Sequence, residues 1–302
     1  MSKISPQVDI AFKKIFGVEE NKDLLISLIN SIVSEADQVA DITLLNPYNP
    51  KNFLTDKLSI LDVKAKGLDG KRFNIEIQIS DAADYDKRAL YYWAKLYTEQ
   101  LQESQDYGLL SKAIGIHILN FLSIPDSPKY HNVFRIIEKE TGITYFKDLE
   151  LHTIELKKFT HDSKDQLSDL IAKVKTSLDM WLAFLTRHDL LKPDALPKEL
   201  NNPNLKKALN VLEVMNLTSI ERDFYEDHLK FLRMEFSTLK KAEEKGREKG
   251  REEGIEIGEA RAEKKGIYFV AKNMLIAGHP IAFVAECTGL SLEEIQAVKD
   301  SL

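Results

Sequence analysis

The chain is short of the residues that interrupt helices and of the residue that makes disulfides. Of its 302 residues, 13 are glycine, 9 are proline and only Cys287 is cysteine. Glycine and proline together make up about 7% of the chain against an average usage near 12%, which predicts that helix dominates. A single cysteine excludes an internal disulfide and a zinc site built from several thiolates. Cys287 also lies in a short apolar helical pattern, which gives no support for a cysteine nucleophile.

Long apolar runs are missing as well. The longest apolar stretch without a charge, residues 113–125, is shorter than the roughly 20 residues that cross a bilayer. Residues 1–17 contain no apolar core of the signal-peptide type. We therefore expect a cytoplasmic protein with no membrane partner. The chain carries 42 basic and 48 acidic side chains, a net charge of −6. Because this balance gives no support for nucleic-acid binding, any such function must rest on local residues.

The glycines are unevenly distributed, and their spacing divides the chain. Four of them, at 246, 250, 254 and 258, recur at every fourth position of a charged stretch, residues 240–265, that has little apolar material to bury. The stretch is typical of a solvated helix or of a flexible linker. A stripe of small residues also permits close helix packing, so a homo-oligomer formed through this segment is a further hypothesis. We expect four parts: a core at 1–160, a helical segment at 161–239, the charged repeat at 240–265 and a tail at 266–302.

The tail resembles a helix-turn-helix pair. Ser291 and Glu294 have the spacing of a capping box, which predicts the start of the second helix. Reading DNA bases requires basic and amide side chains. Residues 279–302 instead carry four acidic side chains and one lysine. The composition therefore favours packing or self-association over DNA recognition by the tail.

Periodicity in the first 160 residues predicts an α/β fold in which helices flank a mixed sheet. Helical patterns with start and stop residues occupy about 5–16, 21–34 and 83–105. Alternating or uncharged apolar runs predict strands at 39–45, 57–66, 72–80, 113–122, 131–137 and 149–156. Beyond residue 165 the pattern is helical, which predicts an all-α C-terminal extension.

The hairpin that follows the first strand is the most informative segment, because its pairing can be derived from its faces. On its second strand, Glu76 and Gln78 point to one face and the isoleucines to the other. A two-residue turn would pair Asp62 with an isoleucine and mix charged with apolar groups on both faces. A three-residue loop with Gly70 in the left-handed conformation gives consistent faces. It pairs Asp62 with Glu76, with β-carbons about 4.5 to 5.5 Å apart.

Two facing carboxylates repel each other, and a divalent cation between them removes the repulsion. Mg²⁺ prefers oxygen ligands at about 2.0 to 2.1 Å, usually one or two carboxylates with waters and substrate phosphate. Asp62 and Glu76 could supply such a set, and a bound metal lowers the pKa of water and stabilises charge on a phosphodiester. On the same face, Gln78 could orient the attacking water and Lys64 could stabilise charge. A strand with a solvated polar face explains the same pattern, so the residues alone leave both interpretations open.

Several segments resemble one nuclease family and follow its order along nearly the whole chain. The order helix, strand, strand, strand, helix, strand, with Asp62 on the second strand and Glu76 and Gln78 on the third, resembles the PD-(D/E)XK nuclease superfamily. More closely, the chain resembles the Rpn family of recombination-promoting nucleases and transposases. The matching segments are SPQVDIAFKKIFG at 5–17, SILDVKAKGLDGKRFNIEIQ at 59–78, KRALYYWAKLY at 87–97, LELHTIELKKF at 149–159 and KGREKGREEG at 245–254.

The resemblance implies a restriction-endonuclease-like core and a metal-dependent DNA endonuclease linked to recombination or mobile elements. It assigns Asp62 and Glu76 as ligands of Mg²⁺, or of another divalent cation such as Mn²⁺ or Ca²⁺, and Gln78 as the third motif residue. Gln78 stands where the superfamily usually has a lysine. We therefore expect either Lys64 or Lys13 to supply the missing positive charge, or turnover to be weak.

Residues from two helices complete the candidate site. The resemblance implies that a carboxylate from the first helix can complete the metal site, which makes Asp9 a candidate third ligand; alternatively, Asp9 is a carboxylate favoured by the helix dipole. Arg88 and Tyr91, three apart on the helix after the hairpin, face the same way and are candidate DNA contacts together with Lys13. Tyr91 could equally belong to the core, and His117 is interpreted as a core histidine. The competing function is a catalytically weak scaffold that keeps the nuclease fold and binds DNA or another protein.

Overall fold

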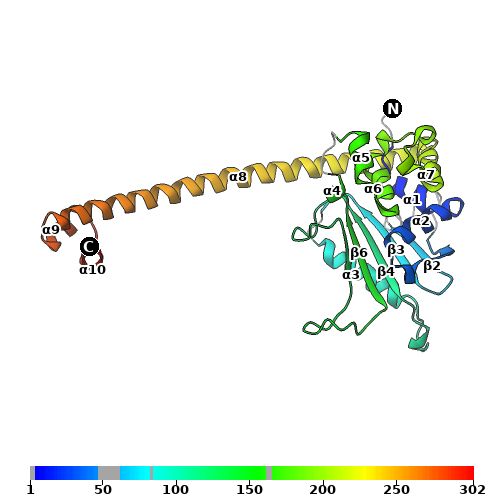
Figure 1. Ribbon diagram of the computed structural model, residues 1–302, viewed down its shortest axis with the longest axis horizontal. Helices are drawn as coiled ribbons and strands as arrows, with labels where there is room; N and C mark the ends of the chain where they lie inside the picture. The colour runs from blue at the N-terminus through cyan, green and yellow to red at the C-terminus, as the bar shows by residue number, and fades with distance from the viewer. Residues whose placement is uncertain (1–3, 47–61, 82–83, 161–164) are drawn as a thin grey trace. The chain divides into compact units, whose positions relative to one another are not determined.

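The computed structural model of the chain describes residues 4–46, 62–81, 84–160 and 165–302 (Figure 1). Residues 57–61 of the predicted second strand and residue 83, the predicted start of the third helix, lie outside these ranges. The chain divides into two compact units, Met1–Leu232 and Arg233–Leu302. The finer division into four parts, drawn from composition, stays a prediction.

The first unit is built on a six-stranded sheet with the strand order β1-β2-β3-β4-β6-β5. The β3–β4 and β4–β6 pairs are parallel, and the other neighbouring pairs are antiparallel. This mixed sheet with flanking helices confirms the predicted fold class. The strands are β1 Ile42–Leu44, β2 Asp62–Gly67, β3 Arg72–Gln78, β4 Ala113–Leu119, β5 His131–Phe134 and β6 Leu149–Glu155.

Helices cover both faces of this sheet (Figure 1). On one face, the isoleucines of β3 and β4 join a large core around the fully buried Trp181 of α6. On the other face, Tyr85 and Ala89 of α3 pack with Leu119 and Phe121. All residues of β4 are buried, as its uncharged sequence predicts. The longer helices are α1 Asp9–Phe16, α2 Lys22–Ile32, α3 Tyr85–Thr98, α6 Ser177–Arg187, α7 Pro203–Glu213 and α8 Ser219–Ile276, with the short α4 Leu156–Phe159 and α5 Leu167–Lys173 between β6 and α6.

The first helix begins later than its sequence predicts. Ser5 and Pro6 form a turn closed by the Val8 amide on the Ser5 carbonyl at 3.3 Å, and α1 starts only at Asp9. Val8 has an extended backbone, with φ −74° and ψ 130°, which allows its side chain to pack with Leu217 and Tyr225. Tertiary packing therefore overrides the local helix-start signal.

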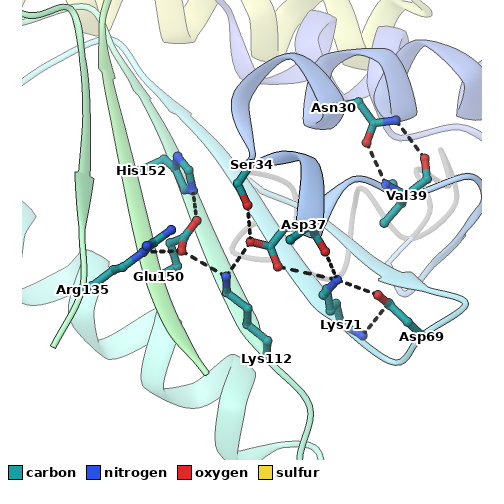
Figure 2. Close-up of polar contacts among 11 residues, drawn as sticks. Asn30, Ser34, Asp37, Val39, Asp69, Lys71, Lys112, Arg135, Glu150 and His152 are labelled. Atoms are coloured by element: carbon teal, nitrogen blue, oxygen red, sulfur yellow. Dashed lines mark hydrogen bonds and ion pairs between the residues drawn. The ribbon is translucent and has the colours of Figure 1, made fainter. Parts of the chain in front are cut away.

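A chain of polar contacts fastens the beginnings of β4 and β6 to the turn that precedes β1 (Figure 2). The almost fully buried Glu150 of β6 accepts hydrogen bonds from Lys112, Arg135 and His152 at 3.0, 2.7 and 2.9 Å. Lys112 also donates to Asp37 at 2.7 Å. Burial acts to raise the pKa of Glu150, but the hydrogen bonds from these three side chains outweigh it and lower that pKa to about 2.

The second unit contains the C-terminal part of α8 together with α9 (Ile281–Thr288) and α10 (Leu292–Asp300). The four glycines of the charged repeat lie within α8, so of the two predicted forms, helix and linker, the chain adopts the helix. Ala271, Val284 and Ile295 form a small core, and Ser291 and Glu294 make the predicted capping box. Within the described ranges, no helix has the length and apolarity needed to cross a bilayer.

Candidate active site

The hairpin of β2 and β3 has the register that its faces predict. Asp62 pairs with Glu76, and Val63 pairs with Ile75. The Gly67 amide donates to the Lys71 carbonyl at 2.9 Å, and Gly70 adopts a left-handed φ of 88°. A Cβ on Gly70 would also lie 2.6 Å from the Ser111 hydroxyl, so the turn needs glycine for its conformation and for its space.

The carboxylates of Asp62 and Glu76 are adjacent on one face of the sheet, and the carboxylate of Glu76 is shielded from water. Glu76 is 4% exposed, so a simple solvated polar face does not describe it. Burial raises the pKa of Glu76 to about 7, the Arg88 guanidinium opposes the rise, and the charge of Asp62 adds to it. Burial also raises the pKa of Asp62, against the cations of Lys64 and Lys13. The site therefore holds two poorly hydrated carboxyl groups that repel each other when both are charged.

Asn46 fixes the outer carboxylate of this pair. Its side-chain amide donates to Oδ1 and to the backbone carbonyl of Asp62 at 3.3 and 3.2 Å. Its carbonyl oxygen accepts from the Lys64 amide at 2.7 Å. Asn46 follows β1, so the end of one strand orients the first carboxylate of the next. Sequence reasoning used Asn46 only as a strand-end signal and missed this role.

The unsatisfied oxygen of Glu76 could serve as a ligand for a cation. Oε2 of Glu76 is buried and has no hydrogen-bond partner among the described residues, while Oε1 lies 3.4 Å from Nη2 of Arg88. The pair offers carboxylate oxygens, which Mg²⁺ prefers, and one or two carboxylates with waters and phosphate are enough for that ion. Among the described residues, no group of three or more His, Cys, Asp or Glu side chains is arranged to hold a metal. The arrangement thus fits a two-carboxylate site and not a complete protein cage.

Asp9 lies within electrostatic reach of Glu76. It is 6% exposed, and burial together with the negative charge of Glu76 raises its pKa to about 7, while Arg88 lowers it. His228, near the start of α8, places Nε2 4.0 Å from Oδ2 of Asp9. The structure thus brings Asp9 to the site without joining it to a three-ligand cluster, and its role as a third ligand stays a prediction.

The predicted cations occupy different positions. Arg88 lies at the site, where Nη2 donates to Oε1 of Gln78 at 2.6 Å and approaches Glu76. Lys13 is 4% exposed and acts electrostatically on Asp62. Lys64 pairs with Glu99 at 3.5 Å. Tyr91 is 63% exposed and packs edge-on against Tyr92, so it belongs to the surface and not to the core.

His117 and Tyr85 form a support behind Glu76 that sequence reasoning did not assign to the site. In the parallel pairing of β3 and β4, His117 is the partner of Glu76, and its Nδ1 lies 3.7 Å from Oε2 of Glu76. The hydroxyl of Tyr85 lies 2.6 Å from the same nitrogen. Burial, aided by the Arg88 charge, lowers the pKa of His117 to about 4, so its ring is neutral. The sequence signal for this role is that His117 lies on the face of β4 opposite the face that carries the isoleucines.

Comparison with known proteins identifies one family. A family model described as PD-(D/E)XK nuclease family transposase matches residues 6–242. The matched range includes both carboxylates and the beginning of α8, and it ends before Gly246. Neither the curated proteins nor the solved structures that were searched include a match to this chain.

Proposed function

The chain belongs to the PD-(D/E)XK nuclease family of transposases, and we propose that it is a divalent-metal-dependent DNA endonuclease acting in recombination or mobile-element transfer. Membership indicates a nuclease function linked to mobile elements, with DNA as the substrate class and divalent metal as the usual requirement of the family. The endonucleolytic cut, the preference for Mg²⁺ and the residue roles below are the proposal for this chain.

The observation that carries the proposal is the facing carboxylate pair, of which Glu76 is buried. Asp62 and Glu76 are directly opposite each other, and no residue that the structure describes forms a hydrogen bond with the buried Oε2 of Glu76. Burying one carboxylate beside another is unfavourable unless a positive charge compensates. A divalent cation is the compensation that the oxygen donors favour, and it explains why the protein retains the arrangement.

Each residue then has a defined part in hydrolysis. Asp62 and Glu76 would hold the cation, which when bound lowers the pKa of a water and stabilises charge on the phosphate. Asn46 holds Asp62 in position, and His117 with Tyr85 limits the movement of Glu76. Water attacks phosphorus and the 3′ oxygen of the neighbouring sugar leaves, which yields 5′-phosphate ends.

Nicking of supercoiled plasmid tests the proposal. With Mg²⁺ or Mn²⁺, the full-length protein should convert supercoiled DNA to the open circle, and EDTA should stop the reaction. Asp62→Asn and Glu76→Gln should each lower the rate by at least about 100-fold, because several kcal/mol of transition-state stabilisation depend on the cation. Ca²⁺ should support DNA binding, measured by fluorescence anisotropy, in the wild type.

The matched control is Glu103→Gln, which removes an exposed carboxylate from the loop after α3 and should nick like the wild type. Equal nicking by wild type and Asp62→Asn would identify a contaminating nuclease. Binding without nicking by any variant or metal would contradict the proposal and support the scaffold function instead.

A further inference from the structure

The third motif position of this nuclease carries no charge, and its amide is occupied by the protein. Nε2 of Gln78 donates to the Ser80 carbonyl at 3.2 Å, and Oε1 accepts from Arg88 at 2.6 Å. Both ends of the amide are therefore used, so Gln78 is poorly suited to orient a water molecule. Its contacts instead indicate that Gln78 positions the guanidinium group of Arg88.

We infer that Arg88 is the catalytic cation of the site and that Gln78 and Glu76 hold it against the scissile phosphate. This inference rests on the proposed nuclease function and deepens it. Arg88 comes from α3, outside the strand motif, so a residue 10 positions after Gln78 supplies the charge that the motif position lacks.

Burial and pairing separate Arg88 from the other two cations near the carboxylates. Lys13 is 4% exposed, which keeps its ammonium from contacting DNA. The Lys64 ammonium is paired with the Glu99 carboxylate at 3.5 Å. The side chain of Arg88 is 33% exposed while one of its nitrogens reaches both Gln78 and Glu76. Arg88 therefore combines the most exposed side chain of the three with hydrogen bonds to Gln78 and Glu76.

The guanidinium is held firmly on one side and is available on the other. Its central carbon lies 5.5 Å from the centre of the Tyr85 ring, which supports it by a cation–π contact. The hydrogen bonds that the guanidinium forms with described residues are donated by Nη2. Nη1 can therefore donate to a phosphate oxygen, and a charge-assisted bond of this kind is stronger than a neutral one. Such a preorganised donor stabilises the charge that develops as the phosphate is attacked.

The electrostatics of the site agree with this placement. The positive charge of Arg88 lowers the pKa of Glu76 and of Asp9 against the effect of burial, and it lowers the pKa of His117. One guanidinium therefore acts on three buried titratable groups of the site, Glu76, Asp9 and His117. Because an arginine stays protonated at all working pH values, the positive charge does not depend on the ionisation of its neighbours.

Exchange of the charge between the two positions tests the inference. Arg88→Gln should lower kcat for plasmid nicking by about 100-fold, the usual cost of losing a preorganised donor. The double variant Arg88→Gln with Gln78→Lys, which returns a cation to the motif position, should recover at least about 10-fold. Free guanidinium at millimolar concentration should also raise the rate of Arg88→Gln and leave the wild type unchanged. The matched control is Lys87→Gln, the adjacent cation, whose side chain is 80% exposed and forms an ion pair with the exposed Asp84.

The outcomes distinguish this inference from the proposed function. If wild-type protein does not nick DNA with any divalent metal, the proposed function is wrong, and the question of a catalytic role for Arg88 does not arise. If the wild type nicks and Arg88→Gln retains activity within about threefold at unchanged melting temperature, the inference is wrong. Loss of activity that neither Gln78→Lys nor guanidinium restores, with DNA binding in Ca²⁺ lost as well, assigns Arg88 a structural role and also overturns it.

Discussion

Replacing Glu150 with glutamine removes the charge at the centre of the polar network in Figure 2 and keeps the shape of the side chain. Glu150 is 1% exposed and compensates two cations, Lys112 and Arg135. Its pKa is lowered from an ordinary value of 4.5 to about 2. A difference of this size corresponds to about 3 kcal/mol at neutral pH. Because Arg135 is half exposed and water screens its charge, we expect about 2 kcal/mol of lost stability.

Urea unfolding followed by the fluorescence of the two tryptophans, Trp93 and Trp181, which both lie in the first unit, measures this loss. A carboxyl group with a lowered pKa stabilises the fold above its unfolded pKa, and this contribution is lost as the pH falls towards about 2. The difference between wild type and Glu150→Gln should therefore be full at pH 7.5, smaller at pH 3 and nearly absent near pH 2. Glu140→Gln, an exposed site on the same hairpin, should change stability by less than about 0.5 kcal/mol. A difference that is below 0.5 kcal/mol at pH 7.5, or that does not depend on pH, would refute the reasoning.

Three further predictions concern the carboxylate hairpin. Burial raises the pKa of Glu76 to about 7, so the metal-free protein should lose stability as the pH rises from about 4.5 through 7. Glu76→Gln should remove part of that loss. Melting temperatures at pH 6 and pH 8 in EDTA measure the loss in both proteins. Added Mg²⁺ at pH 8 should raise the melting temperature of the wild type, and a similar rise in Asp62→Asn would place the ion elsewhere. Gly70→Ala should destabilise the first unit by more than about 1 kcal/mol in urea unfolding, because it strains a φ of 88° and crowds Ser111; an unchanged midpoint would show that the turn rearranges freely.

The features of the fold and of the site that the sequence predicts correctly are those that depend on local sequence patterns. The pairing of Asp62 with Glu76 follows from strand faces and from one glycine in the loop, and both are visible in the sequence. The buried character of β4 follows from its lack of charge, and the capping box at Ser291 from two residues three apart. These features depend on neighbours along the chain, so their physical causes can be read before the fold is known.

The parts that the sequence does not predict depend on long-range packing. The contact between Arg88 and Gln78 requires the placement of α3 against the sheet, and the approach of His228 to Asp9 joins residues more than 200 positions apart. His117 was assigned only to the core because the parallel pairing of β3 with β4, which places it beside Glu76, carries no signal in either strand alone. The start of α1 was also misplaced, because the apolar cluster around Tyr225 fixes Val8 in an extended conformation.

The long helix α8 differs in local stability along its length. At its beginning, Tyr225 is buried and its hydroxyl accepts from the Ser5 amide at 2.9 Å, so amide hydrogens there should exchange slowly with solvent. At Gly246, Gly250, Gly254 and Gly258, no described atom other than those of the adjacent residues and of the surrounding helix backbone lies within 4 Å of the position that a Cβ would take, and glycine itself weakens a helix by up to about 1 kcal/mol. Within α8, transient opening of the backbone is therefore cheapest at these glycines, and a protease that cuts α8 should cut in this segment first. Such a cut would fall just beyond residue 242, where the family match ends, and would release the nuclease unit with its carboxylate site intact.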